Sequence, residues 1–454
     1  MVPEEVTEQP ERNLKQYTHI RFMAILYLAY PIIIAQLGSI LQGWADTIMV
    51  GQYGTPELSA AGFVNNVFNL CLYFLLGISY ATTPVVAAFF SQGKHKDVLR
   101  SFHESNLVNL LMSLVVMTLL LILYLNIHHL GQPTELLPLI RPYFITLLLS
   151  LPFLALFNSM KQYSDALGNT KSPMWVMIGS NILNFLLNYI FIFVIDLGLL
   201  GAGIATFISR ALMPFAMWLI LRNKRQAMVQ GQNVSPNRQG VLTLVRLGIP
   251  ISVQLCLEAG SFNVCVLFMG WIGAAALAAH QIMGTVCTLA FMVIYGIGAA
   301  AAIRIAHHRG LGDWEEVRRT AQTALCLSFI IDAFIVVAIC LAGHPITHLF
   351  TTSREVALLV ISFLPAFVCY QIGDCIQIIY ANALRAIEDV RTMMFYAFIA
   401  YILVSIPLAY IFAFPLHLGA AGIWWSFPFG LSTAGICYYL QFRSHVRKEL
   451  QKQK

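Results

Sequence analysis

The sequence predicts an all-α polytopic membrane protein in which twelve transmembrane helices form two homologous six-helix lobes. Three observations lead to this fold class: a low charge content, twelve long apolar segments and an internal repeat. Charged residues make up only 11% of the 454 residues, against about 25% in soluble domains. So few charges cannot cover the surface of a water-soluble protein of this length, and lipid must therefore cover most of it.

Twelve segments reach the roughly 20 apolar residues that a helix needs to cross a hydrocarbon core. They cover residues 23–50, 58–91, 105–126, 136–160, 174–195, 201–221, 247–270, 276–303, 320–342, 355–382, 393–413 and 419–442. The predicted parts of the chain are an N-terminal segment (1–22), a first lobe (23–221), a linker (222–246), a second lobe (247–442) and a tail (443–454).

The basic residues indicate the orientation of these segments. Twelve crossings place 24 of the 27 Lys and Arg residues on one side of the membrane. Positive residues concentrate in cytoplasmic loops, so the N-terminal segment, the linker and the tail are expected in the cytoplasm. Arg210 lies inside the sixth segment, where it could neutralise an acid on another helix that the sequence does not identify. Because the net charge of +6 is distributed among the loops, it does not indicate a nucleic-acid partner.

The nine cysteines all lie within apolar stretches, and none forms a C-x-x-C pair. We interpret them as small hydrophobic core residues rather than as disulfides or zinc ligands.

The two halves of the chain are related by an internal repeat, in which residues 31–100 resemble residues 250–319 at an offset of 219. Matched pairs are Pro31 and Pro250, Gly51 and Gly270, Gly77 and Gly296, and Arg100 and Arg319. Six helices per repeat give both halves the same membrane orientation, which predicts a pseudo-two-fold axis along the membrane normal. Halves that face one another create a central interface, which is where transporters usually bind their substrates.

Four carboxylates lie inside apolar segments, where each costs roughly 2.5–3.5 kcal/mol on insertion scales and is usually functional. Glu258 has Gln254 four residues before it, and Asp374 has Tyr370 four residues before it. The alternative is a protonated structural group that hydrogen-bonds across helices. We prefer this alternative for Asp332, which has no polar neighbours on its own helix face.

The fourth acid, Asp46, lies near the outer end of the first segment, and the fifth segment carries a polar stripe that includes Asn184 and Asn188. When the repeats are aligned, none of these acids meets another acid, whereas prolines and glycines do match. Residues shared by both halves therefore look architectural, and the unmatched acids look specialised. The chain has no G-x-x-x-x-G-K-[ST] motif and no recognisable catalytic pair, so we expect neither direct ATP use, nor an enzyme, nor a cofactor.

At these residues the sequence resembles the multidrug and toxic compound extrusion (MATE) family, in particular its NorM-type branch. The resemblance covers roughly residues 20–440. Its blocks are Pro31 followed by Asp46 in ADTIMVG, Pro250 followed by Glu258, AAHQ at 278–281, and YQIGDCIQIIYANALRAIED at 370–389.

The resemblance implies a monomer in the bacterial cytoplasmic (inner) membrane that contributes to antibiotic resistance by exchanging cationic, amphipathic drugs for external Na⁺ or H⁺. It assigns the coupling cation, including Na⁺ as a bound metal, to Glu258 and Asp374 with Tyr370. It assigns a proton or substrate cavity to Asp46, Asn184, Asn188, Gln281 and Phe291. Some members have a Tyr facing the cation where this chain has Phe291, which keeps a ring but removes a hydroxyl.

We therefore expect a multidrug antiporter, with sodium the preferred ion because two carboxylates near a tyrosine offer oxygen ligands. One alternative is a lipid-linked oligosaccharide flippase of the same superfamily, although such proteins often have fourteen helices and a cationic cavity. A second alternative, from another class, is an intramembrane enzyme such as a glycosyltransferase or a protease.

Overall fold

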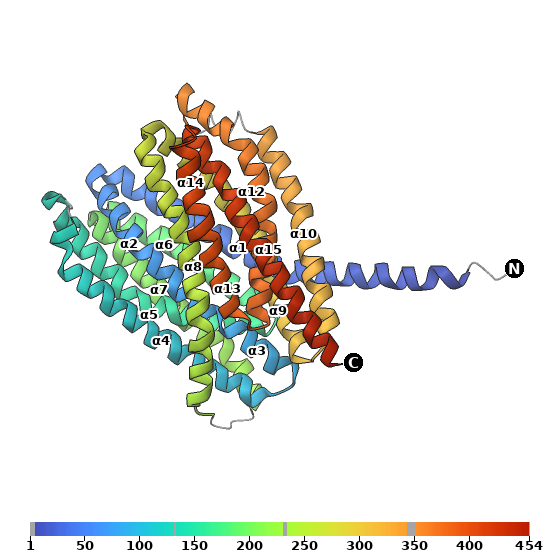
Figure 1. The fold of residues 1–454 in the computed structure, drawn as a ribbon. Coiled ribbons are helices and arrows are strands. Elements are labelled where there is room, and N and C mark those ends of the chain that lie inside the picture. The colour runs from blue at the N-terminus through green and yellow to red at the C-terminus, as the bar shows by residue number, and fades with distance from the viewer. Residues whose placement is uncertain (1–4, 131–132, 230–233, 343–349, 352, 454) are drawn as a thin grey trace. The chain divides into compact units, whose positions relative to one another are not determined.

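The computed structural model describes residues 5–130, 133–229, 234–342, 350–351 and 353–453, and every regular element within these ranges is helical (Figure 1). The first half contains α1 (Glu5–Tyr53), α2 (Thr55–Tyr80), α3 (Thr82–Ser91), α4 (His95–Leu125), η1 (Ile127–Leu130), η2 (Thr134–Leu136), α5 (Leu137–Ala166), α6 (Lys171–Tyr189), η3 (Ile190–Val194) and α7 (Gly198–Val229). The second half contains α8 (Arg238–Ile272), α9 (Ala274–Gly310), α10 (Trp314–Leu341), α12 (Arg354–Ala386), α13 (Val390–Ala397), η4 (Phe398–Ser405), α14 (Ile406–Ala413) and α15 (Gly419–Lys452).

The predicted fold class, an all-α polytopic membrane protein, is confirmed, and the structure is consistent with the predicted twelve membrane helices. Among the described residues, 11 helical segments are long and apolar enough to cross a membrane, and they follow the first eleven predicted segments in order. The twelfth predicted segment lies in α15, a helix of 34 residues that is less apolar. Several helices extend past the apolar runs, because a helix continues into the hydrated region beyond the hydrocarbon. For example, α7 and α8 both reach into the predicted linker, of which residues 230–233 lie outside the described ranges.

The repeat is visible in the backbone as well as in the sequence. Left-handed residues occur at matching turns: Gly93 (φ 69°) matches Gly312 (φ 76°), and Asp196 (φ 62°) matches His417 (φ 54°). Glycine adopts this conformation readily, but the Asp and His require a turn that the surrounding structure enforces. The backbone path is therefore conserved between the halves even where the side chain differs.

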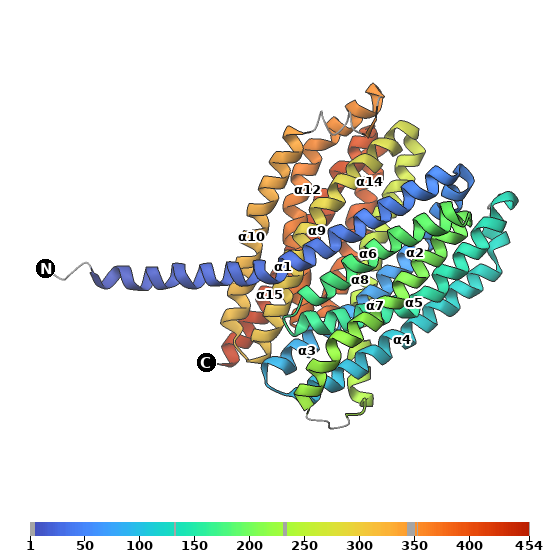
Figure 2. The ribbon, with the colours of Figure 1, turned by 180° about the vertical axis from the view of Figure 1, so that it is seen from behind.

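The chain forms two compact units. The first unit comprises Ile34–Ala259, and the second unit comprises Met1–Ile33 together with Gly260–Lys454. Helices α1 and α8 therefore each contribute residues to both units. Within the second unit α12 packs along α15 and α9, and within the first unit α5 packs along α7 and α4 (Figure 2).

Close helix contacts in the two units also follow the repeat. The Cα of Gly77 lies directly against the backbone of Ser252 in the first unit. The Cα of Gly296 lies against Ile33 in the second unit, and Ser252 and Ile33 differ by the same offset as the two glycines. Small residues allow helix backbones to approach closely, which is how membrane helices gain packing energy when lipid is as apolar as the protein.

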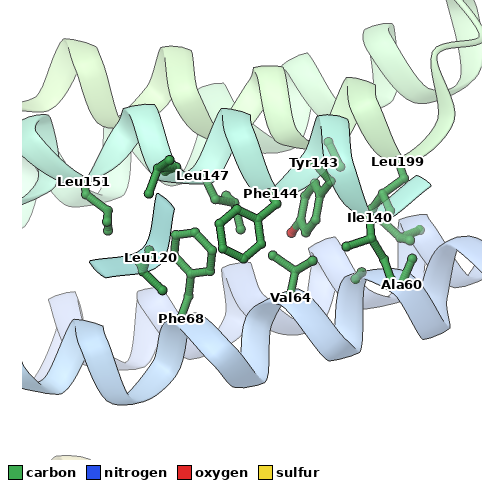
Figure 3. Close-up of a cluster of buried hydrophobic side chains, with 14 of the residues drawn as sticks. Ala60, Val64, Phe68, Leu120, Ile140, Tyr143, Phe144, Leu147, Leu151 and Leu199 are labelled. Atoms are coloured by element: carbon green, nitrogen blue, oxygen red, sulfur yellow. The ribbon is translucent and has the colours of Figure 1, made fainter. Parts of the chain in front are cut away.

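The core of the first unit is formed largely by α2, α4 and α5 (Figure 3). The rings of Phe68 and Phe144 meet edge to face with their centroids 4.9 Å apart. Tyr124 also packs against Phe144, at 5.5 Å between centroids. This packing fixes α5, the helix that carries Tyr143 and Ser150 into the polar region described below.

All nine cysteines are free, as expected, but the prediction that they are core residues is wrong for several of them. Cys265, Cys287 and Cys375 are buried, whereas Cys326, Cys340 and Cys369 are exposed on the protein surface. Hydropathy cannot distinguish the two positions, because a membrane helix is apolar on the face that meets lipid as well as on the face that meets protein.

The connection between α12 and α13 is fixed to α15 by one carboxylate. Gln441 Nε2 donates a hydrogen bond to Asp389 Oδ2 at 2.6 Å, and His445 Nδ1 lies 3.4 Å from the same oxygen. Burial alone would raise the pKa of Asp389, but hydrogen bonds from His445, Gln441 and Thr392 outweigh it and lower the pKa to about 2.

We expect Asp389 to stabilise the protein at neutral pH and to lose this contribution on acidification. Because its pKa in the folded protein is below the ordinary value of about 3.9, the stabilisation is complete above about pH 4 and disappears as the pH falls towards 2. Melting temperatures of the purified Asp389→Asn variant should therefore be lower than wild type at pH 7 and converge with it towards pH 2. Asp97→Asn is the control, since Asp97 pairs with Arg100 on the same exposed helix turn, where ion pairs contribute little. Equal effects of the two substitutions would contradict this expectation.

Candidate cation and substrate site

Three predicted residues come together in the first unit. Asn188 Nδ2 donates to Asp46 Oδ1 at 2.6 Å and to Asn184 Oδ1 at 3.2 Å. Asn184 and Asn188 are fully buried on α6, and Asp46 is half-buried on α1. A carboxylate and two amides therefore form one hydrogen-bonded group between two membrane helices.

The register of α1 and α6 explains why these side chains meet. A Cβ atom at Gly38 would lie 3.2 Å from Nδ2 of Asn181, so the two helices approach closely at this point. Asp46 lies about two turns beyond Gly38 on α1, and Asn188 lies about two turns beyond Asn181 on α6. Because the two helices run side by side, Asp46 meets Asn188 just as Gly38 meets Asn181.

Two further hydrogen bonds in this unit involve residues that the sequence did not indicate. Asn184 Nδ2 donates to Thr206 Oγ1 on α7 at 3.5 Å. Tyr143 Oη on α5 donates to Asn65 Oδ1 on α2 at 3.3 Å. Thr206 could have been recognised, because it lies four residues before Arg210 and thus on the same face of the sixth segment.

Glu258 also belongs to the first unit, near the end of its α8 portion. Gln254, which is fully buried one turn earlier, donates from Nε2 to Glu258 Oε2 at 2.7 Å. Tyr73 on α2 is close enough to interact electrostatically with Glu258. This stretch of α8 is joined to α2 by Ser252, whose Oγ donates to the Phe74 carbonyl at 2.6 Å.

Asp374 and Tyr370 lie one turn apart on α12 in the second unit, and they are 2% and 5% exposed. The Tyr370 ring stacks on Phe367 at 6.3 Å and meets Phe427 of α15 edge to face at 6.4 Å. Cys287 on α9 is close enough to Asp374 to interact with it electrostatically. Asp374 and Tyr370 are therefore both buried in the second unit, where aromatic rings surround Tyr370, while Glu258 belongs to the first unit.

The two remaining predicted residues lie on α9 in the second unit. Gln281 is exposed on the surface of this unit. Phe291 is half-buried and stacks on Tyr295 with 5.9 Å between ring centroids. A tyrosine ring is thus present beside Phe291, one turn further along the helix.

Asp332 has partners on a neighbouring helix although it has none on its own. Gln371 Nε2 of α12 donates to Asp332 Oδ1 at 2.6 Å, and the Cys375 thiol also bonds this carboxylate. Both contacts join α10 to α12. They support the structural interpretation of Asp332 that the sequence favoured.

Comparison with known proteins identifies the family. The MatE family model matches residues 31–190 and 250–411, one match in each half. The probable multidrug resistance protein NorM of Bradyrhizobium diazoefficiens is 31% identical over 97% of this chain and 97% of its own length. The multidrug resistance protein MdtK of Yersinia pseudotuberculosis is 27% identical over 92% of this chain and 94% of its own length.

The fold agrees with a solved structure of the same kind. An outward-facing multidrug resistance MATE family transporter of the MOP superfamily superposes with a TM-score of 0.87 over 95% of this chain and 97% of its own, at 21% identity. The two family matches also divide the chain where the sequence repeat does. The chain therefore belongs to the MatE family of membrane transporters.

Proposed function

We propose that this protein is a multidrug antiporter that exports cationic, amphipathic compounds from the cytoplasm in exchange for Na⁺ or H⁺. The names of its NorM and MdtK relatives, both multidrug resistance proteins, support the efflux function. The choice of a cationic substrate and of a coupling ion depends on the buried acids of this chain.

The observation that carries the proposal is the burial of Asp374 inside a membrane-spanning helix. Asp374 is 2% exposed in the span Arg354–Ala386, and it follows by one helical turn Tyr370, whose ring meets Phe427. Acids at such positions are rare and typically serve ion or substrate pathways. Aromatic faces add roughly 0.5–2 kcal/mol to the binding of a desolvated organic cation.

In this proposal the buried acids have two different tasks. Asp374 with Tyr370 in the second unit serves the coupling ion, and so does Glu258 in the first unit. Carboxylate oxygen atoms suit a hard cation such as sodium. Asp46 with Asn184 and Asn188 binds a proton or the cationic substrate. Further cavity residues are Gln281 and Phe291. Because drug and coupling ion both prefer ionised acids, each weakens the binding of the other, and each biases the transport equilibrium by its differential affinity.

The remaining expectations concern the oligomeric state of the protein, its cellular location and its orientation in the membrane. We propose that it acts as a monomer in the bacterial inner membrane, surrounded by lipid, with both ends of the chain in the cytoplasm. Introduced single cysteines at exposed positions in the N-terminal segment and the tail, labelled from either side of sealed cells, test this orientation.

Reconstituted proteoliposomes test the proposed function. We expect ethidium to accumulate inside the vesicles when a sodium gradient drives sodium out of them. A pH gradient alone should drive a smaller accumulation. Accumulation under a pH gradient but not under a sodium gradient would keep the antiporter and replace sodium by protons as the coupling ion. Movement of a lipid-linked oligosaccharide headgroup without any ethidium transport would contradict the proposal in favour of a flippase.

A further inference from the structure

Arg210 is a cation inside a membrane-spanning helix of the first unit. It lies in the middle of the span Gly198–Arg222, and its guanidinium group stays protonated in any protein environment. Such a charge is stable inside a membrane protein only when other groups compensate it. The groups around Arg210 therefore show what its charge does.

The direct hydrogen-bond partner of Arg210 is neutral. Arg210 NH1 donates to Ser150 Oγ on α5 at 2.9 Å, and Ser150 in turn donates to the Leu147 carbonyl at 2.7 Å. None of the ion pairs within 4.0 Å among the described side chains involves Arg210. Ser150 thus holds the guanidinium group in place but does not balance its charge.

The acid that interacts with Arg210 is Asp46. The two charges attract each other through the interior of the unit, and both also interact with Tyr143. A chain of hydrogen bonds leads from Asp46 through Asn188 and Asn184 to Thr206. Arg210 follows Thr206 by one turn of α7 and lies on the same helix face. It therefore stands at the far end of the polar group that begins with Asp46.

We propose that Arg210 is a fixed internal cation that balances ionised Asp46 and thereby limits how tightly Asp46 holds a proton or a transported cation. This inference rests on the proposed role of Asp46 in binding. A cation that reaches Asp46 must compete with the attraction of Arg210, because binding neutralises the acid and leaves the arginine unbalanced. The attraction is screened little inside the membrane, so it acts without direct contact.

The proposal fixes the direction of each effect. The charged and titratable groups that interact with Asp46 are Arg210 on α7 and Tyr143 on α5, while α6 contributes the neutral amides of Asn184 and Asn188. Removing the positive charge should make Asp46 a stronger base and a tighter cation site. We expect a change of about tenfold in affinity, which corresponds to about one pH unit in a titration.

Ethidium binding to the purified protein at a series of pH values tests the role of Arg210. Arg210→Met keeps an extended side chain but removes the charge. It should tighten ethidium binding at pH 8 by about tenfold. At ethidium concentrations well below the dissociation constant, it should also move the pH at which protons displace ethidium up by about one unit. Arg210→Lys keeps the charge and should restore the wild-type midpoint. An unchanged midpoint and affinity in folded Arg210→Met protein would overturn the proposal.

A thermal double-mutant cycle tests the same pairing without any ligand. Asp46→Asn leaves Arg210 unbalanced, so the double variant Asp46→Asn/Arg210→Met should melt at a higher temperature than Asp46→Asn alone. If the effects of the two substitutions on the melting temperature were purely additive, the proposal would be overturned. This test applies even if Arg210→Met alone is poorly folded. Failure of wild-type protein to bind ethidium would count against the proposed function, while the thermal cycle would still decide whether Arg210 balances Asp46.

Discussion

Asp374→Asn is expected to reduce ion-coupled export to background while leaving the amount of folded protein in the membrane largely unchanged. Asparagine preserves the shape of the side chain, but it cannot carry the negative charge that a coupling cation requires. The loss should be complete because Asp374 is almost fully buried, so water cannot replace its charge. Export of ethidium from proteoliposomes under a sodium gradient, and separately under a pH gradient, measures the effect.

Asp332→Asn is the matched control for this substitution. Asp332 is 4% exposed in the same unit, and its partner Gln371 can donate equally well to an amide oxygen. We expect the Asp332→Asn variant to retain transport, whereas Glu258→Gln should lose it as Asp374→Asn does. Normal pumping by both Glu258→Gln and Asp374→Asn would remove the proposed coupling site.

The second large effect is a loss of stability, expected where a glycine in each half of the repeat packs against the backbone of a neighbouring helical segment. A Cβ atom at Gly201 would lie 2.7 Å from the Phe191 carbonyl oxygen, and a Cβ at Gly422 would lie 2.7 Å from that of Phe412. Gly201→Ala and Gly422→Ala should therefore each force helices apart and destabilise the protein by about 1–3 kcal/mol. The melting temperature of detergent-purified protein, followed by size-exclusion chromatography after heating, measures the loss.

Two other helical glycines serve as matched controls for these substitutions. Gly179 on α6 and Gly284 on α9 have nothing within 4 Å of their Cβ positions, one in each unit. Alanine should stabilise a helix there by roughly 0.5–1 kcal/mol, because glycine loses more backbone freedom on folding. If all four alanine variants melted alike, the close contacts at Gly201 and Gly422 would not determine stability.

The membrane helices could be predicted because lipid imposes one strong rule, namely that each backbone polar group in a crossing segment must be satisfied within a helix. Long apolar runs therefore became helices in the expected order. Their ends were less predictable: the apolar run of α4 begins near residue 105, but the helix begins at His95. Polar residues continue a helix outside the hydrocarbon, and hydropathy does not detect them.

The composition of the two units could not be predicted from apolar runs. Hydropathy shows that a helix crosses the membrane but not which helix it packs against. The contact of Ile33 with Gly296 depends on side-chain shape at one crossing point. Consequently the sequence gives no sign that the chain passes from one unit to the other within α1 and α8.

The candidate site was predictable where the signal lies along a single helix. Asn184 and Asn188 form a stripe on α6, and Gln254 precedes Glu258 by one turn, so spacing alone selected them. Partners on other helices were missed, because no spacing rule connects Asp332 with Gln371 or Arg210 with Ser150. These pairings arise only when helices pack, and they require a structure.

The exchange of segments between the units has a consequence for how the protein is made. Residues up to Ile33 belong with a unit whose other residues begin at Gly260, so the whole of the first unit is synthesised in between. At ordinary rates of translation this interval lasts roughly 10–50 s. The ion pair between Arg21 and Glu316, at 2.6 Å, can form only after it. The beginning of α1 must therefore remain in the membrane without these neighbours until the ribosome has passed Glu316.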